Sequence, residues 1–552
     1  MSEKEKELMQ CRDLSVTIRR TGGAIVENIS FCLERGKNLC IMGESGSGKT
    51  TVVNCVAGYD LYAKGLTVQN PVKINRQSTT VFSVCQDADF FLDPYKTLFY
   101  YIKRAFDVRD RRNVGTRDKR LDTGLLLDYV CLLGLLKPLF EDNGKYTLET
   151  LKDLTSNRSG SLPKKIEKIL INTLKSKTKQ KLSGGEKQKF FLLLAFIVNP
   201  DILVADEIFT DIDDASRNRI SNLIFKQDFT VIFISHNIRL VKKLMDQRAL
   251  TRVYYLKDKT FVPAVWENTG NSTLPPWAEK MIRAHNNIQR LEKKHTTEID
   301  GTVNNGMEIY NIASARKVFR DGRMVKFACR NGNIRLHPGI NYAFAGENGA
   351  GKTTLFKILA KIYDFKGDIL YLHNRQLQKL KNVSRLDFVY KNQLVFQKTG
   401  NAVDDNKPVL EYLLSLFSTE QKTQAVEQIH DLFTQFFKAE KVDFILARRF
   451  HDLSVGEQRR VLLIQALLQV DHRSVLFIDE AMRGMDIFLK EKLVKYIRGR
   501  NLQVFLVTHD CDLVKAVCDR YVWFDYERES ATTYLSGPWS MDTFNRKLGG
   551  NQ

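Results

Sequence analysis

Two stretches that share one pattern decide the fold of this chain: Gly43-Glu44-Ser45-Gly46-Ser47-Gly48-Lys49-Thr50 and Gly346-Glu347-Asn348-Gly349-Ala350-Gly351-Lys352-Thr353. In the pattern G-x-x-x-x-G-K-[ST], the glycines let backbone N–H groups turn toward phosphates. The lysine reaches the terminal phosphates, and the threonine hydroxyl binds Mg²⁺. An apolar run typical of a strand precedes each loop, and a helical pattern follows it. The sequence therefore predicts nucleotide binding at two places.

Further motifs follow both loops in the same order, as expected of an internal repeat of whole-domain length. The first half has LSGGEKQ at 182–188, ILVADE at 202–207 and VIFISH at 231–236. The second half has LSVGEQR at 453–459, VLFIDE at 475–480 and VFLVTH at 504–509. The glutamate and the histidine are 29 residues apart in both halves, at 207 and 236 and at 480 and 509.

The apolar runs that end in paired acids are predicted to be buried parallel strands. Such strands deliver carboxylates to the C-terminal edge of a sheet, where α/β proteins bind their ligands. Two neighbouring carboxylates can divide the work between metal binding and general-base chemistry.

On these motifs, both halves resemble the nucleotide-binding domains of ATP-binding cassette (ABC) proteins. The resemblance covers nearly the whole chain except the middle and one insertion. It implies an α/β fold of two tandem P-loop domains, each with a mixed, mostly parallel sheet and a helical subdomain. It also implies a head-to-tail pseudo-dimer of the two domains, ATP and Mg²⁺ as cofactors, and ATP hydrolysis as the activity.

The resemblance also assigns roles to individual residues. ATP binding is expected from Gly43, Ser45, Gly46, Gly48, Lys49, Thr50, Thr51, Gln86, Ser183, Gly185, Gly346, Asn348, Gly349, Gly351, Lys352, Thr353, Thr354, Gln397, Ser454 and Gly456. The expected Mg²⁺ ligands are Thr50, Gln86, Asp206, Thr353, Gln397 and Asp479. Gln393 is a rival for the place of Gln397. The expected catalytic residues are Glu207, His236, Glu480 and His509, with each glutamate acting on the attacking water and each histidine on the γ-phosphate.

ABC proteins use the LSGGE-type segment to grip the ATP that is bound on the opposite domain. A second interpretation is an ordinary helix cap, because Ser followed three residues later by Glu is also a capping box. In a head-to-tail pair, Lys49 with Glu207 would face Ser454, and Lys352 with Glu480 would face Ser183. Val455 stands where the first copy has Gly184, and a β-branched residue resists backbone conformations that glycine accepts. The site that contains Lys49 is therefore predicted to be the weaker one.

Length and composition indicate how many domains the chain contains. A chain of 552 residues with 43% hydrophobic residues supports two cores. The longest apolar run, 190–198, is too short to span a membrane. The N-terminus does not look like a signal peptide, and nine cysteines without a C-x-x-C pair indicate reduced thiols. We expect a first domain over 1–262 with a basic insertion at about 105–181, a linker over 263–306 with a short helix at 277–294, and a second domain over 307–552.

The net charge of +21 is compatible with three surfaces: one that binds RNA or the ribosome, one that meets anionic lipid, or a solvated face. Residues 87–98 are similar to the corresponding stretch of peptide and nickel importer cassettes. This similarity favours an ATPase that powers membrane permease subunits on separate chains, and that is cytoplasmic and peripheral on the cytoplasmic face of a membrane. The alternative is an ABC protein that acts on the ribosome, although the middle segment is shorter than the long helical hairpin typical of that class.

Overall fold

The computed structural model describes residues 7–20, 22–44, 46–59, 61–62, 65–74, 79–84, 92–112, 122–135, 164–178, 182, 184–209, 214–263, 265–267, 274–295, 309–318, 324–328, 334–346, 351–373, 376–385, 387–388, 392–396, 407–471, 474–479, 485–508, 511–526, 531–533 and 536–538. The chain divides into two compact units, Met1–Glu279 and Lys280–Gln552. The boundary falls inside helix α11 (Pro276–His295). Trp277 of α11 stacks on Tyr255 of the first unit, whereas Ile288 is buried in the core of the second unit.

The first unit contains a mixed sheet and an antiparallel sheet. The mixed sheet has the order β10 (Thr260–Phe261), β9 (Arg252–Lys257), β3 (Leu39–Gly43), β8 (Thr230–Ile234), β7 (Ile202–Asp206) and β6 (Val81–Val84), and β11 (Trp266–Glu267) pairs with β9. The neighbours from β9 to β6 are parallel. The antiparallel sheet consists of β2 (Ala24–Glu34), β1 (Glu7–Ile18), β4 (Leu66–Gln69) and β5 (Lys73–Ile74). Strands β3, β7 and β8 are buried at every position, as expected of central parallel strands.

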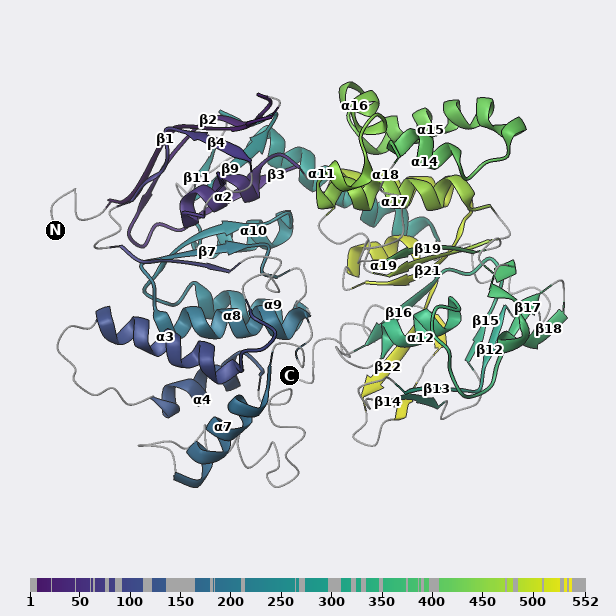
Figure 1. The fold of residues 1–552 in the computed structure, drawn as a ribbon, viewed down its shortest axis with the longest axis horizontal. Helices are drawn as coiled ribbons and strands as arrows, with labels where there is room; N and C mark the ends of the chain where they lie inside the picture. The colour runs from purple at the N-terminus through teal and green to yellow at the C-terminus, as the bar shows by residue number, and fades with distance from the viewer. Residues whose placement is uncertain are drawn as a thin grey trace. The chain divides into compact units, whose positions relative to one another are not determined.

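The helices of the first unit cover both faces of the mixed sheet. Helix α2 (Lys49–Ala57) contributes Val52, Val53 and Val56 to the core that it shares with β1, β2, β3, β7 and β8. Helices α3 (Leu98–Arg112), α4 (Thr123–Leu132), α7 (Lys164–Ser176) and α8 (Gly184–Val198) form a group on the other side of the sheet (Figure 1). Helices α9 (Asp214–Ile224) and α10 (Ile238–Asp246) follow β7 and β8.

The second unit repeats this plan with additions at its edges. Its larger sheet has the order β13 (Ser314–Val318), β14 (Met324–Ala328), β23 (Ala531–Thr533), β22 (Arg520–Tyr526), β16 (Tyr342–Gly346), β21 (Gln503–Val507), β20 (Val475–Asp479) and β19 (Asn392–Phe396), and β24 (Ser536–Pro538) pairs with β22. The strands from β22 to β19 are parallel. The smaller, antiparallel sheet consists of β15 (Ile334–Leu336), β12 (Tyr310–Ile312), β17 (Ile369–His373) and β18 (Gln376–Lys379).

Strand β16 separates the two cores of the second unit. Tyr342 and Phe344 point into the core shared with α12 (Lys352–Leu359), whereas Ala343 and Ala345 belong to the core on the other face. This alternation follows from the two-residue period of a strand. The helices around the second core are α14 (Val409–Leu414), α15 (Lys422–Phe436), α16 (Val442–Leu446), α17 (Val455–Gln469), α18 (Ile487–Gly499) and α19 (Cys511–Val517).

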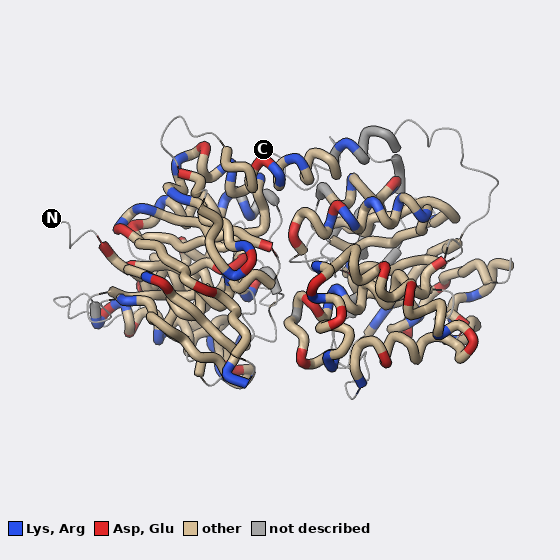
Figure 2. Tube along the Cα trace, turned by 90° about the horizontal axis from the view of Figure 1, so that it is seen from above, with Lys and Arg blue, Asp and Glu red and all other residues tan. Residues whose placement is uncertain are grey.

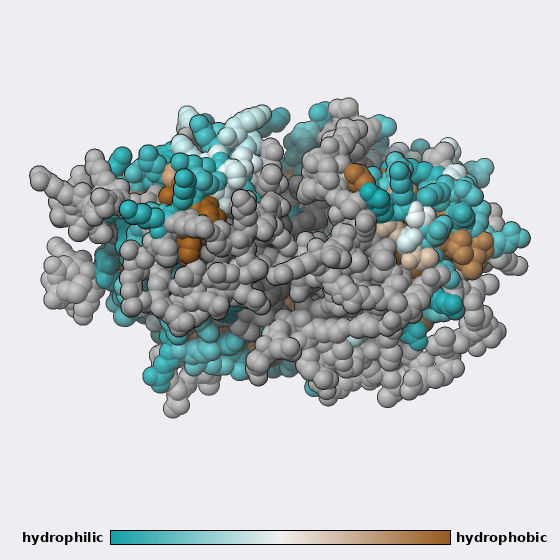
Figure 3. Space-filling view, turned by 90° about the horizontal axis from the view of Figure 1, so that it is seen from below, coloured by the Kyte–Doolittle hydropathy of each residue, from teal (hydrophilic) through white to brown (hydrophobic). Residues whose placement is uncertain are grey.

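The surfaces of both units carry charged and hydrophilic side chains, in contrast to their apolar cores. Lys and Arg are spread over both units (Figure 2). In the view from below, the described residues are mainly hydrophilic, with small hydrophobic areas (Figure 3). Within the described part of the chain, no helix has the length and apolar character needed to cross a bilayer.

Candidate active sites

The first phosphate loop connects β3 directly to α2. Gly48 caps the helix with a left-handed φ of 100°, and a β-carbon there would overlap Val26. Glycine is therefore required both for the backbone and for the space. The Lys49 side chain is buried, and its Nζ donates to the carbonyl oxygens of Gly43 at 3.0 Å and Glu44 at 2.7 Å. The described residues Gly46, Thr50 and Thr51 complete the turn and the start of α2.

The second phosphate-loop sequence also lies between a strand, β16, and a helix, α12, and the structure describes its residues Gly346 and Gly351–Thr353. Gly346 has a φ of 147°, and a β-carbon there would overlap the carbonyl group of Phe524. Gly351 caps α12 with a φ of 88°. The Nζ of the buried Lys352 donates to the carbonyl oxygen of Gly346 at 2.8 Å, which matches the bond from Lys49 to Gly43. The two loops thus hold their lysines in the same way.

The acidic edge of the first unit brings together residues that lie far apart in the sequence. Asp206 is the last residue of β7 and is buried, and Glu207 follows it with a left-handed φ of 51°. The Glu207 N–H donates to the Ile234 carbonyl oxygen at 3.1 Å. Its carboxylate oxygen Oε1 lies 2.5 Å from Nε2 of His236, just after β8. Left-handed backbone in a residue other than glycine is typical of functional sites. The arrangement can present a carboxylate and an imidazole to one reacting group.

In the second unit, the structure describes Asp479, the last residue of β20, and beside it Thr353 of the phosphate-loop sequence. Thr353 Oγ1 donates to Asp479 Oδ1 at 3.2 Å. Burial raises the pKa of Asp479, and the charges of Lys357 and Lys352 and the Thr353 hydrogen bond oppose that shift. A threonine hydroxyl beside an aspartate is the oxygen donor set that Mg²⁺ shares with the phosphates of a nucleotide. Thr354 lies in the next position of α12.

Several predicted site residues lie outside the described residues, so their positions stay predictions. They are Ser45, Gln86, Ser183, Asn348, Gly349, Gln397, Glu480 and His509. Among the residues that the structure does describe, no group of three or more His, Cys, Asp or Glu side chains could hold a metal ion.

The two LSGGE-type segments both open a helix. Helix α8 begins at Gly184 and includes Gly185. Ser454 is the N-cap of α17, and Gly456 lies in its first turn. The Ser454 hydroxyl donates to Glu457 Oε2 at 2.7 Å, and the Ser454 N–H donates to the same atom at 2.9 Å. The second copy thus forms a capping box, and this contact is compatible with both interpretations of the segment.

Sequence analysis missed a pair of asparagines that support both phosphate loops. Asn38 Oδ1 accepts from Val231 N at 2.7 Å, and its Nδ2 donates to the Ala249 carbonyl oxygen at 3.0 Å. Asn341 Oδ1 accepts from Val504 N, also at 2.7 Å, and its Nδ2 donates to Val517 O at 3.0 Å. Each asparagine ties the strand before the loop to the strand before the histidine. Aligning the two halves would have found them, because both precede the loop glycine by five residues.

Comparisons with known proteins agree with this geometry. A family model described as ABC transporter matches residues 26–210 and 329–483. An uncharacterized ABC transporter ATP-binding protein of Methanocaldococcus jannaschii is 23% identical, with 92% of each chain covered. The glutathione import ATP-binding protein GsiA of Pectobacterium atrosepticum is 22% identical, and the match covers 94% of this chain and 84% of GsiA.

Solved structures resemble the whole chain in fold. An RNase-L inhibitor structure has a TM-score of 0.57 at 16% identity and covers 98% of this chain and 93% of its own. An archaeal ribosome recycling factor, aABCE1, solved with the ribosomal stalk protein aP1, has a TM-score of 0.56 at 16% identity, with 97% and 92% covered. At this level of identity, the likeness concerns the fold alone.

Proposed function

The chain belongs to the ABC transporter family and is an ATPase of that family, and we propose that it powers a membrane permease formed by other chains. The observation that carries the proposal is a match over most of the chain to ATP-binding proteins whose names specify import. GsiA is one such protein, and the putative HMP/thiamine import protein YkoD of Bacillus subtilis is another, at 22% identity with 93% of this chain and 89% of YkoD covered. Cargo and direction do not follow from these matches.

In this proposal, the loop glycines and Lys49 or Lys352 hold the ATP phosphates. Mg²⁺ would be bound by the loop threonine and by Asp206 or Asp479, and it would neutralise the charge that develops on the transferred phosphoryl group. Glu207 orients and deprotonates the attacking water. His236, held at 2.5 Å from that carboxylate, fixes its direction and lies ready to contact the γ-phosphate. Glu480 and His509 have the same roles in the second half.

We further propose that the two halves close head to tail as a pseudo-dimer, so that each ATP is completed by the LSGGE-type segment of the other half. In that arrangement, Ser454 and Gly456 would complete the first site, and Ser183 and Gly185 the second. The first site is then the one affected by Val455. Closure on ATP and reopening after hydrolysis would drive the permease.

The alternative function is action on the ribosome. It is favoured by the net charge of +21, since strongly basic proteins bind the RNA phosphate backbone. It is also compatible with the fold, which is shared with the ribosome recycling factor aABCE1. The middle segment argues against it, because its described helix, α11, is packed within the two units and is only 20 residues long.

A pull-down under native conditions separates the two functions. The Glu207→Gln, Glu480→Gln double variant is expected to bind ATP without hydrolysing it and to hold its partners. It should be captured from detergent-solubilised cells with ATP and Mg²⁺, and the partners identified by mass spectrometry. The Lys49→Ala, Lys352→Ala variant is the matched control, because it should not close on ATP.

Recovery of polytopic membrane proteins with the first variant and not with the control would establish the permease. Recovery of ribosomal proteins and rRNA would overturn the transport proposal in favour of the alternative.

A further inference from the structure

One surface of the first unit combines basic charge with exposed tyrosines. It is formed by residues 93–112 and 164–178, which include α3 and α7, and is called the α3–α7 face below. The two segments lie side by side: the Leu98 N–H donates to the Lys177 carbonyl oxygen at 2.9 Å, and Thr97 and Thr178 form an isolated antiparallel bridge. Both helices lie at the lower part of the first unit in Figure 1.

The fold presents the charged side of these helices outward. In α3, Leu98, Ile102 and Phe106 are buried, while Lys103 and Arg104 are exposed. In α7, the buried residues Ile166, Leu170 and Leu174 have the spacing of one helix face, and Lys164, Lys168 and Lys175 are exposed. The apolar stripes therefore anchor the helices to the unit, and their opposite sides form the α3–α7 face.

The charge of the face is strongly one-sided. Among the described side chains of residues 93–112 and 164–178, the exposed acids are Asp93 and Asp107, whereas seven lysines and arginines are exposed: Lys96, Lys103, Arg104, Arg111, Lys164, Lys168 and Lys175. The chain as a whole has a net charge of +21, so this excess is not offset by an acidic surplus elsewhere. Such a face attracts a polyanionic partner.

The tyrosines of the face carry the second observation. Tyr95 is 88% exposed and Tyr100 is 37% exposed. Lys96 Nζ lies 5.2 Å and the Arg104 guanidinium 5.8 Å from the centre of the Tyr100 ring. Lys175 Nζ lies 5.1 Å from the centre of the Phe99 ring. The Tyr100 and Phe99 rings therefore lie beside cations and do not offer open faces for the bases of single-stranded nucleic acid, and Tyr95 alone does not make a series of stacking rings.

We propose that the α3–α7 face binds the anionic headgroups of the membrane in which the permease resides. Lysines and arginines near an anionic lipid surface each strengthen binding about fivefold. Tyrosine suits the boundary between water and headgroups, because its ring is apolar and its hydroxyl is polar. The proposal rests on the proposed transport function, since it places the first half at a membrane, but it needs no contact with a permease.

The test measures binding of the full chain to lipid vesicles by sedimentation, with no permease present. The vesicles are pure phosphatidylcholine, or phosphatidylcholine with about 30% of the anionic lipid phosphatidylserine. We expect binding only to the anionic vesicles, and weaker binding as salt rises. The Lys96→Glu, Lys103→Glu, Arg104→Glu variant should bind at least about a hundredfold more weakly. Tyr95→Ser should reduce binding by a few-fold.

A matched variant controls for net charge. Lys422→Glu, Lys441→Glu, Lys492→Glu changes three exposed lysines of the second unit by the same total charge. It should retain most of the vesicle binding, and all variants should retain ATP hydrolysis, which verifies that they fold. Equal losses in both triple variants would overturn the proposal, as would equal binding to neutral vesicles.

A 20-nucleotide oligouridine identifies the competing partner. If it binds through the α3–α7 face while anionic vesicles do not, the proposal is overturned in favour of RNA. Vesicle binding without any permease in the pull-down would refute the transport function and leave the lipid-binding face in place. A captured permease without vesicle binding would support the transport function and refute the lipid-binding face.

Discussion

The two units build the same nucleotide-binding fold around cores of different composition. Four core positions that correspond by their distance from the motifs are aliphatic in the first unit: Ile41, Val53, Val204 and Ile232. All four are phenylalanine in the second unit: Phe344, Phe356, Phe477 and Phe505. Every one of the eight side chains is at most 1% exposed. The four corresponding positions therefore differ together: all are aliphatic in the first core and all are phenylalanine in the second.

The phenylalanines of the second unit contact one another in a closed ring. The centroid distances are 5.7 Å for Phe344 and Phe356, 5.2 Å for Phe356 and Phe477, 5.3 Å for Phe477 and Phe505, and 5.8 Å for Phe505 and Phe344. Close-packed cores accept such changes only when neighbouring side chains change together. The two units therefore share the pattern of strands and helices but not the identity of these core residues. In the second unit, this cluster also holds the helix that follows the phosphate loop.

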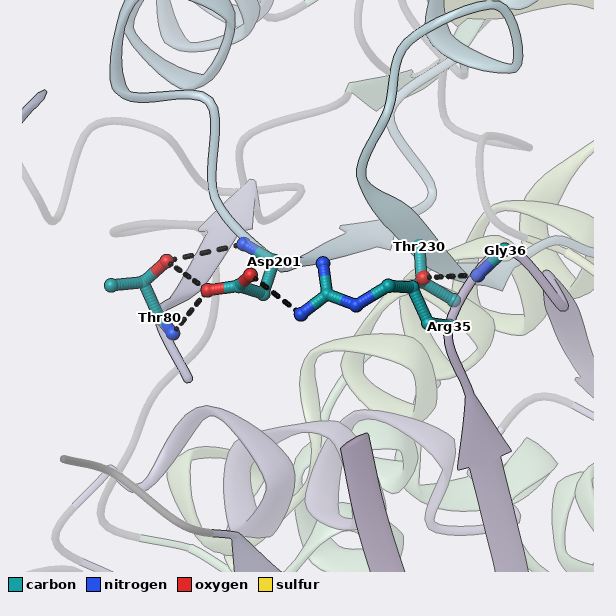
Figure 4. Close-up of polar contacts among 5 residues, drawn as sticks. All are labelled: Arg35, Gly36, Thr80, Asp201 and Thr230. Carbon is teal, nitrogen blue, oxygen red and sulfur yellow. Dashed lines mark hydrogen bonds and ion pairs between the residues drawn. The ribbon is translucent and has the colours of Figure 1, made fainter. Parts of the chain in front are cut away.

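The sheet edge opposite the nucleotide also differs between the units. In the first unit, Asp201 accepts from Thr80 N at 2.9 Å, from Thr80 Oγ1 at 3.0 Å and from Arg35 Nη2 at 3.1 Å (Figure 4). In the second unit, neutral amides serve there: Asn392 Oδ1 accepts from Val475 N, and Gln503 Nε2 donates to the His337 and Ile340 carbonyl oxygens. The first unit joins the starts of β6 and β7 through the Asp201 carboxylate, whereas the second unit uses amides at Asn392 and Gln503 and keeps a carboxylate at Asp519, which accepts from Asn341 N at 2.8 Å.

The largest change in ATP hydrolysis is expected from replacing the two glutamates that we propose as general bases. Glu207→Gln and Glu480→Gln should each slow hydrolysis at their own site by about 10²- to 10⁴-fold, because a general base is lost. If Val455 weakens the site that contains Glu207, Glu480→Gln should leave a residual rate several-fold below that of Glu207→Gln. Steady-state phosphate release measures both rates.

Val455→Gly is the matched control for this asymmetry. Added to Glu480→Gln, it should raise the residual rate, since it restores the residue that the first copy has at Gly184. Equal residual rates of the two single variants would remove the case for unequal sites.

The second effect tests the aromatic ring cluster. Phe477→Ala should lower the local free energy of unfolding of the second unit by about 3–5 kcal/mol, because it leaves a large cavity. Val204→Ala, at the corresponding position of the first unit, should cost about 2 kcal/mol, mainly for two lost methyl groups. Hydrogen exchange resolved by peptide measures each unit separately, which a single melting curve of a two-domain chain does not. A smaller loss for Phe477→Ala than for Val204→Ala would show that the ring cluster is loosely packed.

The sequence predicts the fold of both units and part of the candidate site, but not every contact within them. The duplicated loops, the buried strands that end in Asp206 and Asp479, and the two-domain α/β fold follow from motif and periodicity, and the structure confirms them. The family resemblance assigned Glu207 and His236 to one ATP site, but the contact between them was not predicted, because 29 residues separate them in the sequence. The Asp201 network could not be predicted, because it joins the starts of strands that become neighbours only when the sheet forms.

The third effect concerns this charged edge of the first unit. Asp201→Ala should destabilise the first unit by about 1–3 kcal/mol, because it leaves the Thr80 N–H and hydroxyl without their acceptor. Arg35→Ala should cost less than about 1 kcal/mol, since the Arg35 side chain is 44% exposed and its ion pair is screened by water. Urea unfolding followed by hydrogen exchange in β6 and β7 measures both changes. If Arg35→Ala costs as much as Asp201→Ala, the ion pair and not the Thr80 contacts holds this edge.

The smallest effect is a pH dependence at the nucleotide edge of the second unit. Burial raises the pKa of Asp479, so the folded state favours its protonated form. The ionised carboxylate therefore costs stability at neutral pH, and this cost disappears as the pH falls through the raised pKa to the ordinary value of about 4. Asp479→Asn should thus stabilise the second unit at pH 7.5 and give no gain at pH 4, while abolishing Mg²⁺-dependent hydrolysis at that site. Hydrogen exchange in β20 at both pH values, corrected for intrinsic rates, checks this. A gain of equal size at both pH values would mean that packing, not the buried charge, sets the stability of this edge.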